Sequence, residues 1–180
     1  MKSPEELTLE EKIEILSNYI RYLLATQAAM VMPLIEKYGD EAKEYLKKQL
    51  RLKMKVHFEK LIKKKKIKER NLKAFRELFW ETVLLPLSII GQSGGIVVEA
   101  TDKKLVTRDT KCIELESWKE ITDKPEIMCE IDAETAFAMA EAINPKLKYT
   151  KYSGDKIKGK IDWGLPYGKP YCEFIVELKE

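Results

Sequence analysis

The segment Cys129–Pro145 constrains the fold most, because its pattern predicts a buried helix with defined ends. A helix that is apolar on nearly all sides is expected inside a core rather than on a surface. We expect Asp132 to cap the start of this helix, since its carboxylate can accept hydrogen bonds from the free N–H groups of the first turn. We expect Asn144-Pro145 to end it, because the residue before a proline avoids the helical region. The apolar positions between these ends are Ala133, Ala136, Phe137, Met139, Ala140 and Ile143.

This interpretation places Cys129 and Asp132 together at the entry to the helix. The positive end of the helix dipole stabilises negative charge there and lowers the pKa of a thiol. Cys129 and Asp132 are therefore the candidate catalytic residues, Cys129 as a nucleophile or water-positioning group and Asp132 as a proton carrier. The simpler alternative is a helix cap beside a small core residue.

Two further cysteines come from other elements, Cys112 from the end of a predicted strand and Cys172 from within one. We expect them to line a shared pocket and, with Asn144, to bind a substrate. Cys112, Cys129 and Cys172 are also a candidate soft-ligand set for zinc or iron. No pair has the C-x-x-C spacing of a zinc ribbon, so a site without metal, with the cysteines as buried core residues, stays open.

Residues 1–90 have the spacing of helices and predict a helical bundle. Thr8 and Glu11 have the spacing of a capping box. We expect a kink or a break at Pro33 and a stop at Gly39. The predicted helices are residues 8–38, 40–67 and 69–85, the last ended by Pro86. The single histidine, His57, is expected to be a partly buried helix residue rather than part of a catalytic triad.

Residues 91–180 have the composition of strands around the buried helix. A hairpin is expected about Asp102-Lys103-Lys104, and a short helical link at Trp118–Ile121. Cys172, Phe174, Val176 and Leu178 alternate with polar neighbours, which is typical of a half-buried strand. The predicted strands are residues 96–101, 105–113, 146–152, 156–163 and 171–178. The fold class is therefore α+β: an N-terminal helical bundle followed by a small antiparallel sheet with a buried helix packed on it. Residues 91–95 would join the two regions.

The net charge of +3 hides a strongly basic segment, Lys43–Arg70, with thirteen Lys or Arg and three Glu. It has no helix-turn-helix signal and no aromatic residues interleaved on its basic face, so a solvated helix face is a better explanation than nucleic-acid binding. An acidic protein partner on this segment and a homo-oligomer are further hypotheses. The odd cysteine count, the polar N-terminus and the lack of a long apolar run predict a cytoplasmic protein without a transmembrane segment. The Lys- and Glu-rich composition is typical of thermophilic proteins.

With these residues identified, the chain resembles the L-2-amino-thiazoline-4-carboxylic acid hydrolase family. The resemblance is carried by Val106…Cys112, Cys129-x-x-Asp132, Asn144-Pro145, Gly168-x-x-x-Cys172-x-Phe174, and the upstream Tyr38-Gly39-Asp40-Glu41-Ala42. One departure is Cys112-Ile113, where the family pattern has Cys-Pro. The resemblance implies that water cleaves a C–N or C–S bond in a small cyclic amidine-like thiazoline acid. It implies Cys129 and Asp132 as site residues, with Cys112 and Cys172 lining the pocket.

The C-terminal half also resembles the 4-vinyl reductase type of small-ligand domain, through Gly168-x-x-x-Cys172-x-Phe174. That resemblance implies a ligand sensor or carrier. Three hypotheses therefore stay open: a hydrolase, a module that binds a small ligand or metal without catalysis, and an accessory protein that uses the basic helix.

Overall fold

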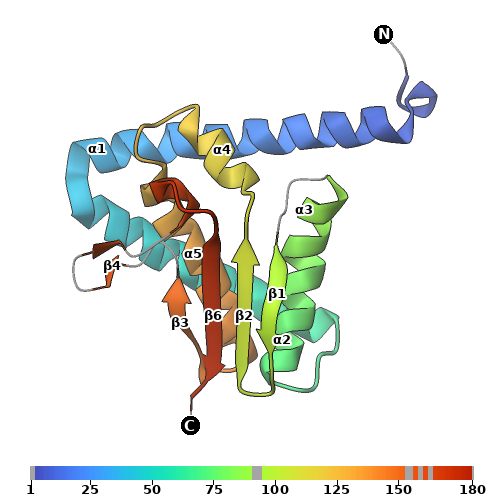
Figure 1. Ribbon diagram of the computed structural model, residues 1–180, viewed down its shortest axis with the longest axis vertical. Helices are drawn as coiled ribbons and strands as arrows, with labels where there is room; N and C mark the ends of the chain where they lie inside the picture. The colour runs from blue at the N-terminus through green and yellow to red at the C-terminus, as the bar shows by residue number, and fades with distance from the viewer. Residues whose placement is uncertain (1–2, 91–94, 153–155, 158–159, 162–163, 180) are drawn as a thin grey trace.

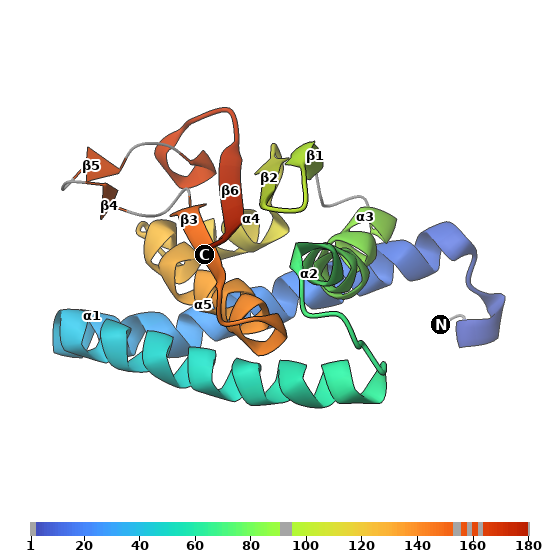
Figure 2. The same ribbon diagram turned by 90° about the horizontal axis from the view of Figure 1, so that it is seen from below.

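The structure is a computed structural model that describes residues 3–90, 95–152, 156–157, 160–161 and 164–179. A four-stranded antiparallel sheet of order β1-β2-β6-β3 has helices packed on one face (Figures 1 and 2). This confirms the predicted α+β class, with N-terminal helices followed by a small antiparallel sheet. The predicted joint at residues 91–95 lies outside the described residues except for Gly95.

The first helix, α1 (Leu9–Lys64), begins with the predicted capping box. Glu11 N donates to Thr8 Oγ1 at 3.2 Å, and Thr8 N donates to Glu11 Oε2 at 2.8 Å. Of the kink or break predicted at Pro33, the break does not occur, because the helix continues through this exposed proline with the loss of one backbone hydrogen bond. The chain turns instead at Gly39, as predicted, with φ 67° and ψ −151°. The second part of α1 ends at Lys64 rather than at residue 67.

A second helical rod is built from α2 (Leu72–Phe79), the π-helical turn η2 (Trp80–Leu84) and α3 (Leu85–Ile89). It starts after Asn71, whose Oδ1 accepts from Ala74 N at 3.0 Å, which is three residues later than the start predicted at about residue 69. Pro86 does not end the rod as predicted. It occupies the first turn of α3, a position where a missing N–H costs little.

The sheet contains the predicted hairpin of β1 (Ile96–Ala100) and β2 (Lys104–Asp109). The strand β6 (Cys172–Leu178) lies between β2 and β3 (Leu147–Tyr152), and its register sets Asp109 opposite Cys172. The single strand predicted over residues 156–163 is wrong. The structure instead pairs two short strands, β4 (Lys156–Ile157) and β5 (Lys160–Ile161), as a separate hairpin.

The predicted buried helix is α5 (Pro125–Ile143), which lies between the sheet and α1 (Figure 2). It ends at Asn144 as predicted. It begins seven residues before Asp132, so the prediction that Asp132 caps it is wrong. Pro125 is the reason, because its fixed φ and missing N–H suit the first position of a helix. The short helix α4 (Ile113–Lys119) precedes α5 and replaces the predicted link at residues 118–121.

The core spans both predicted regions. One cluster joins the second part of α1, α2, α5 and the sheet through buried residues that include Phe58, Phe75, Met139 and Val176. The other joins the first part of α1 with α4 and α5 around Trp118. In the described part of the chain, no helix has both the length and the apolar character that crossing a bilayer requires.

The basic segment of α1 turns one side toward α5. Lys43 Nζ lies 3.0 Å from Glu130 Oε2, and Arg51 forms ion pairs with Glu134 and Glu141. Part of the positive charge is thus neutralised within the molecule. The remaining lysines near the end of α1, Lys60 and Lys63–Lys66, are exposed, as is His57, for which the expected partial burial is wrong.

Candidate functional site

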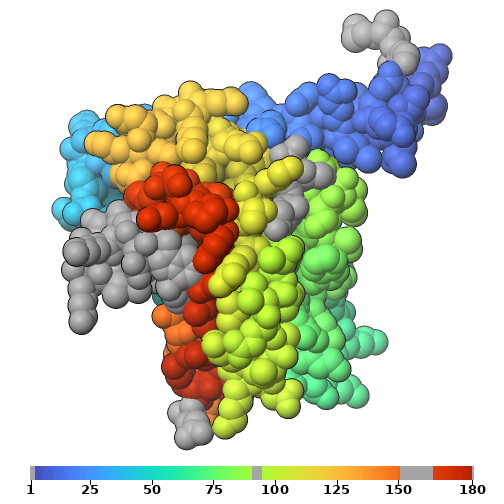
Figure 3. All heavy atoms as spheres, viewed as in Figure 1, coloured from blue at the N-terminus to red at the C-terminus, as the bar shows by residue number. Residues whose placement is uncertain are grey.

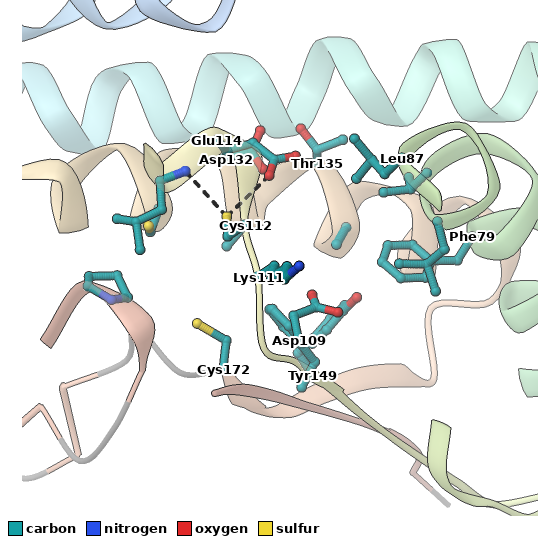
Figure 4. A pocket seen from close by; sticks show the side chains of 18 of the residues that line it. Phe79, Leu87, Asp109, Lys111, Cys112, Glu114, Asp132, Thr135, Tyr149 and Cys172 are labelled. Carbon is teal, nitrogen blue, oxygen red and sulfur yellow. Dashed lines mark hydrogen bonds between the residues drawn. The ribbon is translucent and has the colours of Figure 1, made fainter. Parts of the chain in front are cut away.

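A cavity of about 130 Å³ lies between α5, the start of α4, the η2–α3 segment and the strands β2 and β6 (Figure 4). One water molecule needs only about 10–15 Å³ of such space, so the cavity has room for a small organic molecule. Its lining is mainly apolar, with a few polar groups, as in ligand sites generally. The apolar lining residues include Phe79, Val83, Leu84, Leu87, Leu115, Trp118, Ala133, Ala136, Met139 and Phe174.

The π-helical turn η2 contributes Val83 and Leu84 to one wall of this cavity. A π-helical turn inserts one extra residue into a helix and is found frequently at functional sites. It shifts the register of the rod between Phe79 on α2 and Leu87 on α3, both of which face the cavity. The turn thus supplies an aromatic and aliphatic wall opposite the polar side of the site.

Four of the five residues selected from the sequence meet at this cavity. Cys112, Cys129, Asp132 and Cys172 all line it. Asn144 does not, because it lies at the far end of α5 and serves the backbone there. Its Nδ2 donates to the carbonyl of Arg70 at 2.7 Å, and its Oδ1 accepts from Lys146 N at 2.9 Å.

Two of the thiols hold local structure. Cys112 is the N-cap of α4 rather than a strand end, and its Sγ accepts from Leu115 N at 3.3 Å while it donates to Glu114 at 3.2 Å (Figure 4). Cys172 Sγ accepts from Leu165 N at 3.3 Å and so anchors the 3-10 turn Leu165–Tyr167. These sulfur atoms fill positions where an oxygen acceptor is more usual.

The expected lowering of the thiol pKa is wrong. Because α5 begins at Pro125, Cys129 lies inside the helix and away from its positive end. Burial raises the pKa of Cys129, and the neighbouring charges of Cys172 and Asp132 raise it further. Burial likewise raises the pKa of Cys112, with Glu114 as the next cause. Both groups are neutral thiols at pH 7, and a neutral thiol is a poor nucleophile and a poor metal ligand.

The predicted three-cysteine metal site does not form. Among the residues that the structure describes, no group of three or more His, Cys, Asp and Glu side chains is placed to hold a metal ion. Cys112, Cys129 and Cys172 share the cavity wall but do not converge on one point. Their donor atoms therefore do not fit zinc or iron.

Three carboxyl groups dominate the electrostatics of the cavity. Asp132 and Glu114 lie on one side, and Asp109 lies beside Tyr149 on another (Figure 4). Burial raises the pKa of Asp132 to about 7 and that of Asp109 to about 6, with the charge of Glu114 as the second cause in both. Protein atoms surround Asp132 on all sides. Its side chain is nevertheless partly exposed, because it faces the cavity. The lysine of the cavity lining, Lys111, does not lower the pKa of either carboxyl group.

Two buried polar atoms at the cavity lack hydrogen-bond partners among the described residues: Asp109 Oδ1 and Trp118 Nε1. The Trp118 side chain is almost fully buried, with 1% of its surface exposed. A buried polar group without a partner is costly, and each such group in a native fold calls for an explanation. Asp109 and Trp118 line the cavity, but each of these two atoms has less than 1 Å² of accessible surface, so a bound molecule reaches them only if neighbouring side chains move.

Sequence reasoning missed Asp109, Glu114, Trp118 and Tyr149. Little in the sequence marked Asp109, since it ends a strand that already carries Lys104, Thr107 and Arg108. Glu114 lies two residues after Cys112, the N-cap of α4. Acidic residues are common in the first turn of a helix, so its sequence position does not indicate a site. Tyr149 and Trp118 look like core aromatics, and only the three-dimensional arrangement places them on the cavity wall.

The arrangement can bind a small molecule between apolar walls and move protons at neutral pH through Asp132 or Asp109.

Comparison of the chain with models of protein families, with curated proteins and with solved structures gave no match. The resemblance drawn from sequence motifs therefore has only those motifs behind it.

Proposed function

We propose that this protein binds a small organic cation, such as an amidinium or a protonated nitrogen heterocycle, in the cavity between α5 and the sheet. The observation that carries the proposal is a set of three carboxyl groups, Asp109, Glu114 and Asp132, on the wall of a mainly apolar cavity. The one lysine of this lining, Lys111, does not lower the pKa of Asp109 or Asp132. A buried carboxylate is unfavourable unless it is paired or hydrogen-bonded. A cationic ligand supplies the missing charge.

The shape of the wall supports a flat ligand. Phe79, Tyr149 and Phe174 border the cavity, and the faces of aromatic rings attract cations within about 6 Å. The preferred ligand is therefore cationic at one end and aromatic or heterocyclic in its body.

The test uses benzamidine, a flat cation, and benzamide, its neutral counterpart of the same shape. Calorimetric titration and thermal unfolding at pH 8 should detect benzamidine, and benzamide should bind at least about tenfold more weakly, because a charge-assisted hydrogen bond contributes about 1.5–3 kcal/mol. The D132N variant should lose this preference. Equal binding of the two compounds, or no binding of either at millimolar concentration, would contradict the proposal.

A second candidate is hydrolysis of a cyclic amidine acid of the thiazoline type, in line with the sequence resemblance. The observation that favours it is the carboxyl of Asp132, whose pKa of about 7 suits a general acid or base at neutral pH. In this scheme water adds to the amidine carbon while Asp132 accepts its proton. Asp132 then returns that proton to the departing sulfur or nitrogen. Lys111, an exposed lining residue, is available for the substrate carboxylate.

This scheme differs from a thiol mechanism in what each variant should do. Cleavage of the C–S bond liberates a thiol, which a chromogenic disulfide detects after incubation with 2-amino-thiazoline-4-carboxylic acid. D132N should reduce the rate by about 100-fold or more, and C129A should retain most of it. The opposite ranking would restore Cys129 as the nucleophile. No consumption of the acid would leave cation binding as the only candidate.

A further inference from the structure

The outer face of the first part of α1 is an apolar stripe. It consists of eight large side chains, each between 46% and 70% exposed: Leu9, Ile15, Leu16, Tyr19, Tyr22, Leu23, Met30 and Leu34. The opposite face of the same segment packs into the molecule through Ala28, Met32 and Ile35. On that face Arg21 Nη2 also forms an ion pair with Oε2 of Glu116 on α4, at 2.9 Å. The helix is therefore apolar on both sides, and within the described part of the chain the outer side has no apolar partner.

The first turns of α1 project beyond the rest of the molecule (Figures 1 and 3). Helices in proteins owe most of their stability to packing of an apolar face rather than to intrinsic propensity. Leu9, Ile15 and Leu16 lie on the projecting turns and are more than half exposed. A well-capped helix end that leaves Leu9, Ile15 and Leu16 exposed among the described residues is a segment that a second chain would stabilise.

The spacing of the stripe is that of a helix-pairing surface. Leu9, Leu16, Leu23 and Met30 recur every seven residues, the repeat that keeps one seam facing a partner helix. Tyr19 lies three residues after Leu16, and Tyr22 three after Tyr19, which places both beside the same seam.

The area is also sufficient for a dimer. At roughly 150–200 Å² for a large side chain, the exposed fractions of the eight residues amount to about 700–900 Å² per copy. A stable interface of standard size buries about 800 Å² per partner. Two copies of the same stripe are the simplest way to cover it, because a two-fold axis makes one surface self-complementary.

The charge of the segment argues against a membrane surface as the occupant. Helices that lie in a bilayer interface are rich in Lys and Arg on their polar face. From Leu9 to Tyr38 the acidic residues are Glu10, Glu11, Glu14 and Glu36, and the basic residues are Lys12, Arg21 and Lys37. This near-neutral, slightly acidic balance gives no attraction to anionic lipid.

We propose that the apolar stripe on the first part of α1 is the interface of a homodimer, in which the stripes of two copies pack as a helix pair. The interface lies away from the cavity-lining residues. It is also distinct from the basic segment at Lys43–Arg70, which the sequence alone had suggested as a binding surface.

The test is the mass of the full chain in solution, by light scattering and sedimentation at tens of micromolar. The wild type should have twice the 21.0 kDa mass of one chain. The L16E/L23E variant should be a monomer with an unchanged circular dichroism spectrum. The matched control is L52E/V56E, which changes two equally exposed apolar residues on the second part of α1 and should remain a dimer.

Three results would overturn the proposal. A monomeric wild type at these concentrations excludes the dimer. A dimer that survives L16E/L23E, or one that L52E/V56E dissociates, places the interface elsewhere. A monomer that binds phosphatidylcholine–phosphatidylglycerol vesicles, and loses that binding in L16E/L23E, assigns the stripe to a membrane instead.

Discussion

Arg51 of α1 places its Nη1 3.2 Å from Oε2 of Glu134, a buried residue of α5. The same guanidinium pairs with Glu141 and lies over the ring of Phe137, with Cζ 5.3 Å from the ring centroid. Arg51 of α1 thus neutralises the negative charges of Glu134 and Glu141 on α5, the helix that also carries Asp132. The basic segment has a structural role on this side, whatever its exposed lysines bind.

Removing Arg51 should therefore destabilise the fold. Loss of one partner from a buried ion pair costs about 3–5 kcal/mol, and because the Arg51 side chain is 39% exposed we expect about 1–2 kcal/mol for R51A in urea unfolding at pH 7. K60A, which removes an exposed lysine from the same helix, should change the free energy of unfolding by less than about 0.5 kcal/mol. Equal effects of the two changes would mean that the pair contributes nothing.

Gly39 sets the turn that brings the second part of α1 under α5. Its φ of 67° and ψ of −151° lie in a region that is open almost only to glycine. The space around its missing Cβ is empty, so the cost of a side chain is backbone strain alone. G39A should lower the free energy of unfolding by about 1–3 kcal/mol. G168A, at a φ of 74° in the more permissive left-handed region, should cost less in the same measurement.

The turn at Gly39 also shows why part of the fold was predictable. Local signals, such as the Thr8–Glu11 capping box, Gly39, the hairpin at Asp102–Lys104 and Asn144-Pro145, act over a few residues and are all present in the structure. The errors arose where one local signal is compatible with two different structures. Pro33, Pro86 and Pro125 all lie within helices, but proline patterns alone do not tell a first-turn proline from a helix end.

The candidate site was predictable only in part, for a related reason. Cys112, Cys129, Asp132 and Cys172 stood out because they are chemically distinctive, and the fold does bring them to one cavity. The pKa shifts were predicted in the wrong direction, because they depend on burial and on Glu114, and sequence spacing reports neither. Asp109 joins the site through the register of β2 against β6, a long-range property.

The thiols should be unreactive in the folded protein. Since burial raises the pKa of Cys112 and Cys129, few thiolates exist at pH 7.5, and iodoacetamide should label these residues at least about 100-fold more slowly than a free cysteine. Labelling in urea should be complete, which mass spectrometry of digested protein can assign to each cysteine. Rapid labelling of Cys129 in the native state would contradict the burial argument and favour a nucleophilic role.

Asp132 should make the fold less stable as the pH rises. Its folded pKa of about 7 lies above the ordinary value of 3.8, so the folded state holds this proton more tightly than the unfolded state does. The free energy of unfolding is therefore highest below pH 4 for this group and falls as the pH rises toward 7. At 1.36 kcal/mol per unit the loss is at most about 4 kcal/mol, and water in the cavity reduces it.

The D132N side chain is neutral at every pH, like the protonated acid. The variant should therefore not show the decrease in the free energy of unfolding that ionisation of Asp132 causes in the wild type. In urea unfolding it should be more stable than the wild type at pH 8 by about 1–4 kcal/mol, and the difference should vanish near pH 4. Asp109 is unchanged in this variant, so a smaller pH dependence should remain up to about pH 6. A saturating cation such as benzamidine should reverse the ranking at pH 8, because it stabilises only the wild-type carboxylate. If D132N is less stable than the wild type at pH 8 without ligand, Asp132 already has a compensating partner in the protein, and the cavity has no need of a cation.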